Sequence, residues 1–290
     1  MEFNIISPKT KQELLKAMKE NKSFRFGAGY TDLILELKRN NSEGITVLNL
    51  ALLKDKQFSA IEKTANGLRI GSLATIAQIE NNDFIKKNFP VLQQAAYNLA
   101  SSQIRQVATV GGNICTASPS GDVACALVAL KARCEILSSS GKTRIVPIEE
   151  FFTGPRKTVL KKQEVLRSIT ILNNEKNKNI HSGFIKIGTR QSMECSVVSL
   201  AYHIQTSTAG KITAVGVSIG SVAPTIRSVN HASDYLIGKN ISELQDSDKK
   251  TFAEKVTEYA SPISDLRASE WYRKEVLYNT AKSILEKHGD

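Results

Sequence analysis

Apolar and polar positions switch between helical and strand-like spacing along the first half of the chain. Residues 10–20 place leucines and a methionine at helical spacing among lysines, which predicts an amphipathic surface helix. Residues 23–50 alternate strand, glycine loop, helix and strand, which predicts a β-loop-α-β unit. Helices are expected again from Thr75 and from Pro90, because proline is well accommodated in the first turn of a helix.

The second half of the chain has a more strand-like pattern. Residues 133–146 predict a β-hairpin around a Ser-Ser-Gly-Lys turn, and residues 151–155 predict a loop. A strand is expected at 165–171, and further strands are expected between 184 and 220. The most polar run is 173–179, which we interpret as a linker between two domains.

Two glycine-containing segments are candidates for binding a phosphate-bearing ligand. The first, Gly27-Ala28-Gly29-Tyr30-Thr31-Asp32, lies between a predicted strand and a predicted helix. Backbone N–H groups at such a junction form a site for diphosphate. A dinucleotide fingerprint would require a third glycine at the position of Asp32, so a Rossmann domain is disfavoured.

The second segment covers residues 103–122. Its adjacent Gly111 and Gly112 allow a close approach of the backbone to a ligand. Side chains with hydrogen-bonding groups surround them, namely Thr109, Asn113, Ser118 and Asp122. We place Asp122 near the N-cap of a buried helix, where its carboxylate could also bind a hydroxyl. On spacing alone, a glycine-rich turn between two buried elements explains the segment equally well.

Composition narrows the class of protein. The 290 residues are 41% hydrophobic and 23% charged, which is enough for two modest soluble domains. The beginning of the sequence has no leader-like run, and no apolar run approaches the roughly 20 residues of a membrane span, which predicts a cytoplasmic protein. The four cysteines and four histidines lack metal-ligand spacing, so no metal site and no iron–sulfur cluster is predicted.

The net charge of +11 is open to more than one interpretation. The densest basic run lies between Arg156 and Arg167, and it suits either a solvated face or the docking of an acidic partner subunit. Basic and aromatic residues are not interleaved, so nucleic acid is not predicted as a partner.

Residues 103–119 resemble the second flavin-binding segment of the FAD subunits of molybdenum hydroxylases, most closely those of the bacterial xanthine dehydrogenase family. The first segment is similar to the family's Ala-Gly-Gly-Thr-Asp loop, with Tyr30 in place of the second glycine. Residues 184–190 resemble the family's Phe-x-Lys-x-x-x-Arg segment. Residues 265–273 resemble its closing Asp-x-Arg-Ala-Ser-x-x-Tyr-Arg, so the similarity covers essentially the whole chain.

This resemblance implies an α+β fold in two parts. Residues 1–175 would form an FAD-binding domain of the PCMH (vanillyl-alcohol-oxidase-like) type, with subdomains at about 1–55 and 56–175. Residues 180–290 would form a smaller α+β C-terminal domain.

The resemblance also implies one non-covalent FAD, since neither glycine segment contains a histidine for a flavin link. Leu99 would reach the flavin edge or pack in the core. No catalytic residue stands out. The expected cofactor-binding residues are Arg25, Phe26, Gly27, Ala28, Gly29, Tyr30, Thr31, Asp32, Leu99, Thr109, Val110, Gly111, Gly112, Asn113, Ser118, Asp122, Leu166 and Lys186.

In function, the resemblance implies an electron-transfer subunit. It would take electrons from the [2Fe–2S] clusters of an iron–sulfur subunit, beside a molybdopterin subunit that hydroxylates the substrate, and pass them to NAD⁺ or another acceptor. The substrate of the complex stays open among purines, nicotinate and aldehydes. The alternative is a self-contained PCMH-fold flavin reductase or oxidase; a non-enzymatic basic binding module explains neither glycine segment.

Tyr30 leaves two hypotheses open. If the position requires a positive φ, a tyrosine there carries strain of about 1–3 kcal/mol. Alternatively, the ring is useful because it stacks on a flavin or adenine face, or limits how a nicotinamide reaches the flavin.

Overall fold

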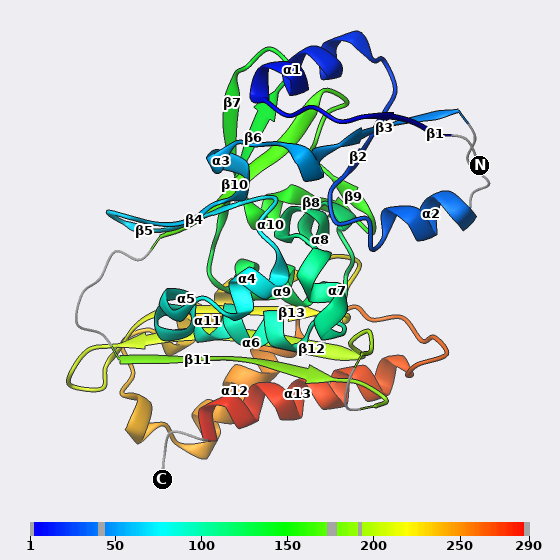
Figure 1. The fold of residues 1–290 in the computed structure, drawn as a ribbon. Helices are drawn as coiled ribbons and strands as arrows, with labels where there is room; N and C mark the ends of the chain where they lie inside the picture. Colours follow the sequence, from blue (N-terminus) through cyan, green and yellow to red (C-terminus); the bar gives the residue numbers. More distant parts are fainter. Residues whose placement is uncertain (1–2, 40–43, 173–178, 191–192, 287–290) are drawn as a thin grey trace.

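The computed structural model describes residues 3–39, 44–172, 179–190 and 193–286 (Figure 1). Helices and strands alternate through the first half, and long antiparallel strands followed by helices form the second. The mixed α+β class predicted from the sequence is therefore confirmed. Across these residues, no helix combines the length and the apolar character needed to cross a membrane.

The N-terminal part is built around a small parallel sheet in the order β1-β3-β2. Its elements are β1 (Phe3–Ile6), α1 (Lys11–Glu20), β2 (Arg25–Gly27), α2 (Leu33–Arg39), β3 (Ile45–Asn49), the 3₁₀ helix η1 (Leu50–Leu52) and α3 (Lys56–Ser59). The predicted β-loop-α-β unit is β2, α2 and β3, and the parallel register of β2 and β3 confirms it. The Gly27–Asp32 loop connects the end of β2 to the start of α2.

A five-stranded antiparallel sheet in the order β4-β5-β10-β6-β7 follows. Its strands are β4 (Ile61–Thr64), β5 (Gly67–Gly71), β6 (Arg133–Ser138), β7 (Thr143–Pro147) and β10 (Glu164–Leu172). The predicted hairpin is β6 and β7. A second small hairpin pairs β8 (Phe152–Gly154) with β9 (Lys157–Thr158).

Short helices lie between this sheet and the sheet of the C-terminal part (Figure 1). They are α4 (Ile76–Glu80), α5 (Asp83–Asn88), α6 (Pro90–Asn98), α7 (Ser102–Val107), α8 (Val110–Thr116), α9 (Asp122–Ala129) and α10 (Ile148–Phe151). Thr75 caps α4, and Pro90 is the first residue of α6, as predicted.

The C-terminal part consists of a four-stranded antiparallel sheet and helices on its far face (Figure 1). It contains β11 (Asn179–Ile187), β12 (Val198–Thr206), β13 (Ile212–Gly220), β14 (Arg227–Ser228), α11 (Asn230–Leu236), η2 (Ile241–Glu243), α12 (Asp246–Thr257) and α13 (Glu270–Glu286). The helix α6 packs on β11, and α9 packs on β12 and β13.

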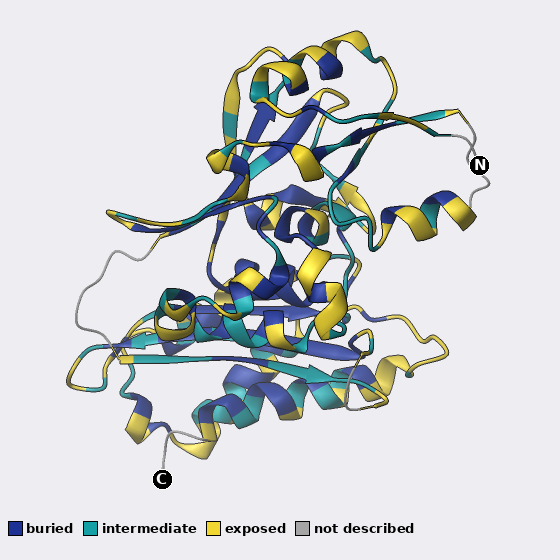
Figure 2. Cartoon of the chain, viewed as in Figure 1, coloured by how far each residue is buried: buried dark blue, intermediate teal, exposed yellow. Residues whose placement is uncertain are grey.

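The main hydrophobic core runs through both predicted domains. It joins the central helices and the five-stranded sheet to Phe184, Ala201 and Ile226 of the C-terminal part. Figure 2 shows the buried residues concentrated in this central region, while α1, α2 and α7 carry exposed faces. A second core fills the space between the C-terminal sheet and its helices. The sheet of the C-terminal part therefore packs directly on α6 and on α9, and α9 begins at the end of the second glycine segment.

Two local predictions were wrong. Residues 151–155 are not a plain loop, because Phe151 ends α10 and β8 begins at Phe152, and the two buried rings pack edge to face 5.7 Å apart. Asn179, placed in the linker, begins β11. The rest of that predicted linker, 173–178, lies outside the described residues, and the division into domains stays a prediction.

Candidate cofactor-binding site

The two glycine segments, far apart in sequence, form one continuous surface. Gly29 lies so close to the C-terminal end of α7 that a Cβ atom there would be 2.1 Å from the carbonyl oxygen of Val107. Thr116, at the end of α8, donates a hydrogen bond of 3.0 Å from its Oγ1 to Oδ2 of Asp32. The first loop thus rests directly on the second segment.

The first loop has backbone groups available for a ligand. Among the described residues, no hydrogen-bond acceptor is found for the backbone N–H groups of Gly29, Tyr30, Thr31 and Asp32. The loop runs into the first turn of α2, where Glu36 donates its N–H to the carbonyl of Asp32. Unpaired N–H groups at the start of a helix are donors for an anion such as diphosphate. The four unpaired N–H groups of the first loop are therefore suited to binding the diphosphate of FAD.

The second segment is a short helix and not a glycine turn. Thr109 caps α8, and its Oγ1 accepts the Gly112 N–H at 3.0 Å. The N–H groups of Val110 and Gly111 donate to the carbonyls of Ala74 and Ser72. The alternative of a glycine-rich turn was therefore wrong, and helix formation and packing on residues 72–74 use these N–H groups.

The two adjacent glycines have different surroundings. Gly111 is buried, and a Cβ atom there would lie 2.6 Å from the Ser72 carbonyl oxygen. Gly112 is exposed, and its nearest neighbour would be Thr109 Oγ1 at 3.1 Å. The bare backbone available to a ligand is thus at Gly112.

Asn113 connects α8 to the next helix. Its Oδ1 accepts the backbone N–H of Ala124 at 3.1 Å. Within the described part of the chain, its Nδ2 has no hydrogen-bond acceptor, so this amide can donate to a ligand. Ser118 follows on the connection to α9, and its Oγ accepts the backbone N–H of Ser120 at 3.3 Å.

Asp122 and Lys186 form a buried ion pair at the inner end of the site. Lys186 Nζ lies 2.6 Å from Asp122 Oδ2 and also donates to the carbonyl of Asn98 at 3.1 Å. Ser196 donates to the other carboxylate oxygen at 2.9 Å. Burial raises the pKa of Asp122, and the charge of Lys186 opposes that shift. This pair joins the start of α9 to β11, so it connects the two predicted domains.

Asp122 lies next to the N-cap of a buried helix, as predicted. Gly121 is the N-cap of α9 and makes no side-chain cap bond, while Asp122 is the first helical residue. Its carboxylate turns to Lys186 and Ser196 instead. The carboxylate is held by contacts across the domain boundary and not by its own helix.

The two apolar residues that were expected to contact the flavin, Leu99 and Leu166, lie in different elements. Leu99 ends α6, is partly buried against the main core, and its carbonyl accepts a hydrogen bond of 3.1 Å from Arg105. Leu166 is only 1% exposed within β10. Leu166 belongs to the main core, and its contact with the flavin stays a prediction.

Tyr30 has φ of +60°, the conformation that its place in a usual glycine position suggested. Its ring covers Gly27, where a Cβ atom would come within 2.5 Å of the ring carbons. The ring also packs against the small cluster that contains Leu33, Leu37 and Val47, and burial raises the pKa of its hydroxyl. The ring therefore supports its own loop, which was not one of the two roles expected.

The neighbouring residues of β2 have structural contacts. Arg25 forms a two-pronged ion pair with Glu36 of α2 at 2.7 and 2.9 Å. Phe26 packs edge to face on Phe24 with 5.1 Å between ring centroids. The ion pair joins α2 to β2 across the first glycine loop, and the ring contact packs the start of β2.

Several residues that hold the site in place were missed from the sequence. Ser196, Thr116 and Asn98 make the contacts described above. Arg273 of the closing motif is 4% exposed and donates to the carbonyls of Val197 and Ser221 at 2.7 and 2.9 Å. Arg273 therefore positions the residue next to Ser196. Its motif was identified from the sequence, whereas no local sequence pattern identifies Ser196, Thr116 or Asn98.

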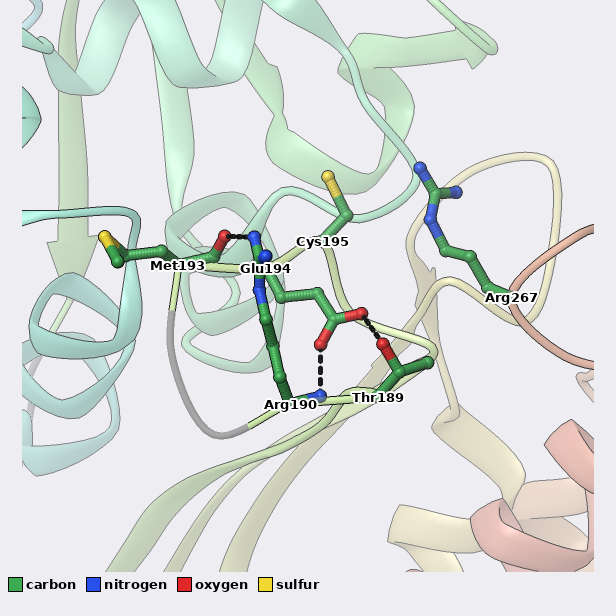
Figure 3. Close-up of a pocket in the computed structure, with 6 residues that line it drawn as sticks. All are labelled: Thr189, Arg190, Met193, Glu194, Cys195 and Arg267. Atoms are coloured by element: carbon green, nitrogen blue, oxygen red, sulfur yellow. Dashed lines mark hydrogen bonds between the residues drawn. The ribbon is translucent and has the colours of Figure 1, made fainter.

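An open hollow lies between the connection of β11 to β12 and Arg267, which precedes α13. Its volume is about 340 Å³, and it is lined by Thr189, Arg190, Met193, Glu194, Cys195 and Arg267. Figure 3 shows the Glu194 carboxylate turned toward Thr189 and the backbone of Arg190, with Arg267 opposite. The hollow contains none of the predicted cofactor residues, although Cys195 directly precedes Ser196.

Within the described residues, no group of three or more His, Cys, Asp or Glu side chains is arranged so that it could hold a metal ion. The four cysteines are present as free thiols. Burial raises the pKa of Cys115 and Cys125 to about 12, which keeps both as thiols.

Two family models match the chain. The model for the FAD-binding domain in molybdopterin dehydrogenase matches residues 1–171. The model for the CO dehydrogenase flavoprotein C-terminal domain matches residues 184–288. Together they account for most of the chain.

Individual relatives agree with these models. The chain is 28% identical to a xanthine dehydrogenase FAD-binding subunit of Escherichia coli O157:H7, over 95% of this chain and 92% of that protein. It is 27% identical to a nicotinate dehydrogenase FAD-subunit of Eubacterium barkeri, over 98% and 95% of the two chains. A chain of the reconstituted CO dehydrogenase from Oligotropha carboxidovorans has the same fold, with a TM-score of 0.90 at 21% identity over 100% of this chain and 98% of that one.

Proposed function

Because this chain belongs to the family of FAD-binding subunits of molybdenum hydroxylases, we propose that it transfers electrons from a partner's [2Fe–2S] clusters to NAD⁺ or another acceptor. The chain is an oxidoreductase subunit with an FAD-binding domain. Bound FAD supplies chemistry that protein side chains lack, because it can accept electrons singly and release them as a pair.

One observation carries the proposal: the first loop, with its unpaired N–H groups, rests on the second segment through the contacts of Gly29 with Val107 and of Asp32 with Thr116. In this arrangement, Gly29 to Asp32 would hold the diphosphate through backbone donors. Gly112 and the Asn113 amide would lie along the same ligand. The buried pair of Asp122 and Lys186 would provide an acceptor and a donor for polar groups at the far end.

We propose two partner subunits, an iron–sulfur subunit and a molybdopterin subunit that hydroxylates the substrate. The matched relatives are themselves named as FAD subunits of dehydrogenases, which supports this division of labour. The substrate would be chosen by the molybdopterin subunit, so this chain does not distinguish purines, nicotinate and aldehydes. The cytoplasmic location expected from the sequence stays a prediction.

Reconstitution tests the proposal. The FAD-loaded chain is mixed without oxygen with the iron–sulfur and molybdopterin subunits, and flavin absorbance is followed after addition of a purine, nicotinate or an aldehyde. We expect the flavin to be reduced only when both partners are present, and to be reoxidised on addition of NAD⁺ or a dye. Oxidation of any of these substrates by the chain without partners would instead support a self-contained flavoenzyme.

A further inference from the structure

Arg156 is held beside the site by its backbone. It lies in the turn between β8 and β9, and its N–H donates to the carbonyl of Ala117 at 3.0 Å. Ala117 directly follows α8 and directly precedes Ser118. The hairpin also contacts α8, as Figure 1 shows.

The backbone of Arg156 is strained. Its φ is +57°, a conformation that glycine adopts without cost and an arginine adopts only against steric repulsion. Other non-glycine residues with positive φ also border the site, including Tyr30, Ala100 and Ala117. Strain of this kind is concentrated at functional sites in many proteins.

The side chain of Arg156 is exposed, and its guanidinium has no hydrogen-bond or ion-pair partner among the described residues. By contrast, Arg25 and Arg105 are committed to Glu36 and Glu80. The charge of Arg156 nevertheless reaches α2, because it helps to lower the pKa of Glu36. Its backbone also lies next to Thr116, whose hydroxyl donates to Asp32 of the loop with unpaired N–H groups.

The other arginine beside this loop is already engaged. Arg25 is paired with Glu36, and the Asp32 carboxylate accepts the Thr116 hydroxyl. A diphosphate adds negative charge to this surface, so an unpaired cation beside it favours binding. Arg156 is such a cation, with its backbone held at the end of α8.

We propose that Arg156 is a binding residue for the diphosphate of FAD, and this inference rests on the proposed function. The guanidinium supplies a planar set of donors suited to phosphate oxygens, while Gly29 to Asp32 supply backbone donors from the other side. The strained turn keeps the arginine at the end of α8, where a glycine would be easier to accommodate but would provide no charge.

The test compares Arg156→Gln with Lys157→Gln, which removes the same charge from the next exposed residue. Affinities of the full chain are measured for FAD, for ADP and for riboflavin, which has no phosphate. We expect Arg156→Gln to weaken FAD and ADP binding about 10- to 100-fold, the loss typical of one charge-assisted hydrogen bond. Riboflavin binding should be unchanged, and Lys157→Gln should bind all three ligands as the parent does.

A second variant separates binding from folding. Arg156→Gly removes the side chain and relieves the positive φ, so the FAD-free chain should become more stable while FAD binding weakens as in Arg156→Gln. FAD affinity in both Arg156 variants equal to that of Lys157→Gln would overturn the inference and leave the proposed function standing. Failure of the parent chain itself to bind FAD would overturn both.

Discussion

Replacing Gly112 with alanine should stabilise the empty protein and weaken its hold on FAD. Gly112 lies in the first turn of α8, where alanine is favoured over glycine by about 0.5–1 kcal/mol. The added methyl group would lie 3.1 Å from Thr109 Oγ1, a contact that a small shift relieves. The free energy of unfolding of the FAD-free chain should therefore rise by up to about 1 kcal/mol.

The effect on FAD binding has the opposite sign. Gly112 is the exposed glycine of the pair, and the methyl group would occupy the face where we place the cofactor. Forcing a methyl group into a packed contact costs about 1–3 kcal/mol, which weakens binding roughly 5- to 150-fold. Denaturant unfolding of the FAD-free chain gives the first quantity, and titration of flavin fluorescence gives the second.

Gly111→Ala is the matched control. Its Cβ atom would lie 2.6 Å from the Ser72 carbonyl oxygen and 2.7 Å from the Ser72 Cβ, so the backbone must move. This variant should lose stability with or without FAD. A Gly112→Ala protein that binds FAD as tightly as the parent would refute the placement of the cofactor against Gly112.

Three further outcomes follow from buried groups and from the first loop. Asp122→Ala should cost about 3–5 kcal/mol of unfolding free energy, because it leaves Lys186 buried without its partner; a loss of only about 1 kcal/mol would indicate a capping role. Burial lowers the pKa of His203 to about 4, so the unfolded chain takes up the proton first as pH falls below about 6.5. The free energy of unfolding should therefore fall by about 2 kcal/mol between pH 7 and pH 5. An equal fall over the same pH range in a His203→Gln variant would exclude this residue as the cause. Tyr30→Gly should retain FAD but change the rate of flavin reduction by NADH, and unchanged stopped-flow traces with greater stability would mean that the ring is merely tolerated.

Much of the fold could be predicted because the relevant signals are local. The β2-α2-β3 unit, the β6–β7 hairpin and the start of α6 at Pro90 each depend on periodicity or on a turn residue. The helix α8 could not be predicted in this way, because two adjacent glycines disfavour a helix. Its cap at Thr109 and its packing on Ser72 override that preference, and both need the folded neighbours.

The residues of the site also divide into those with a local sequence signal and those without one. The two glycine segments carry a family pattern and could be identified from the sequence, although their direct contact through Thr116 and Asp32 could not. Ser196 and Asn98 hold the buried ion pair, yet they lie in different elements and have no motif of their own. Leu166 lies within the core of β10, and the cofactor contact that similarity implies for it stays a prediction.

The central claim, that this chain holds FAD between its two glycine segments, is tested most directly by the flavin content of the purified full chain after incubation with FAD. We predict one FAD per chain, all of it released into the supernatant by acid precipitation, because no side chain is expected to bind the flavin covalently. A chain that takes up no flavin, or flavin that stays with the precipitated protein, would contradict the account.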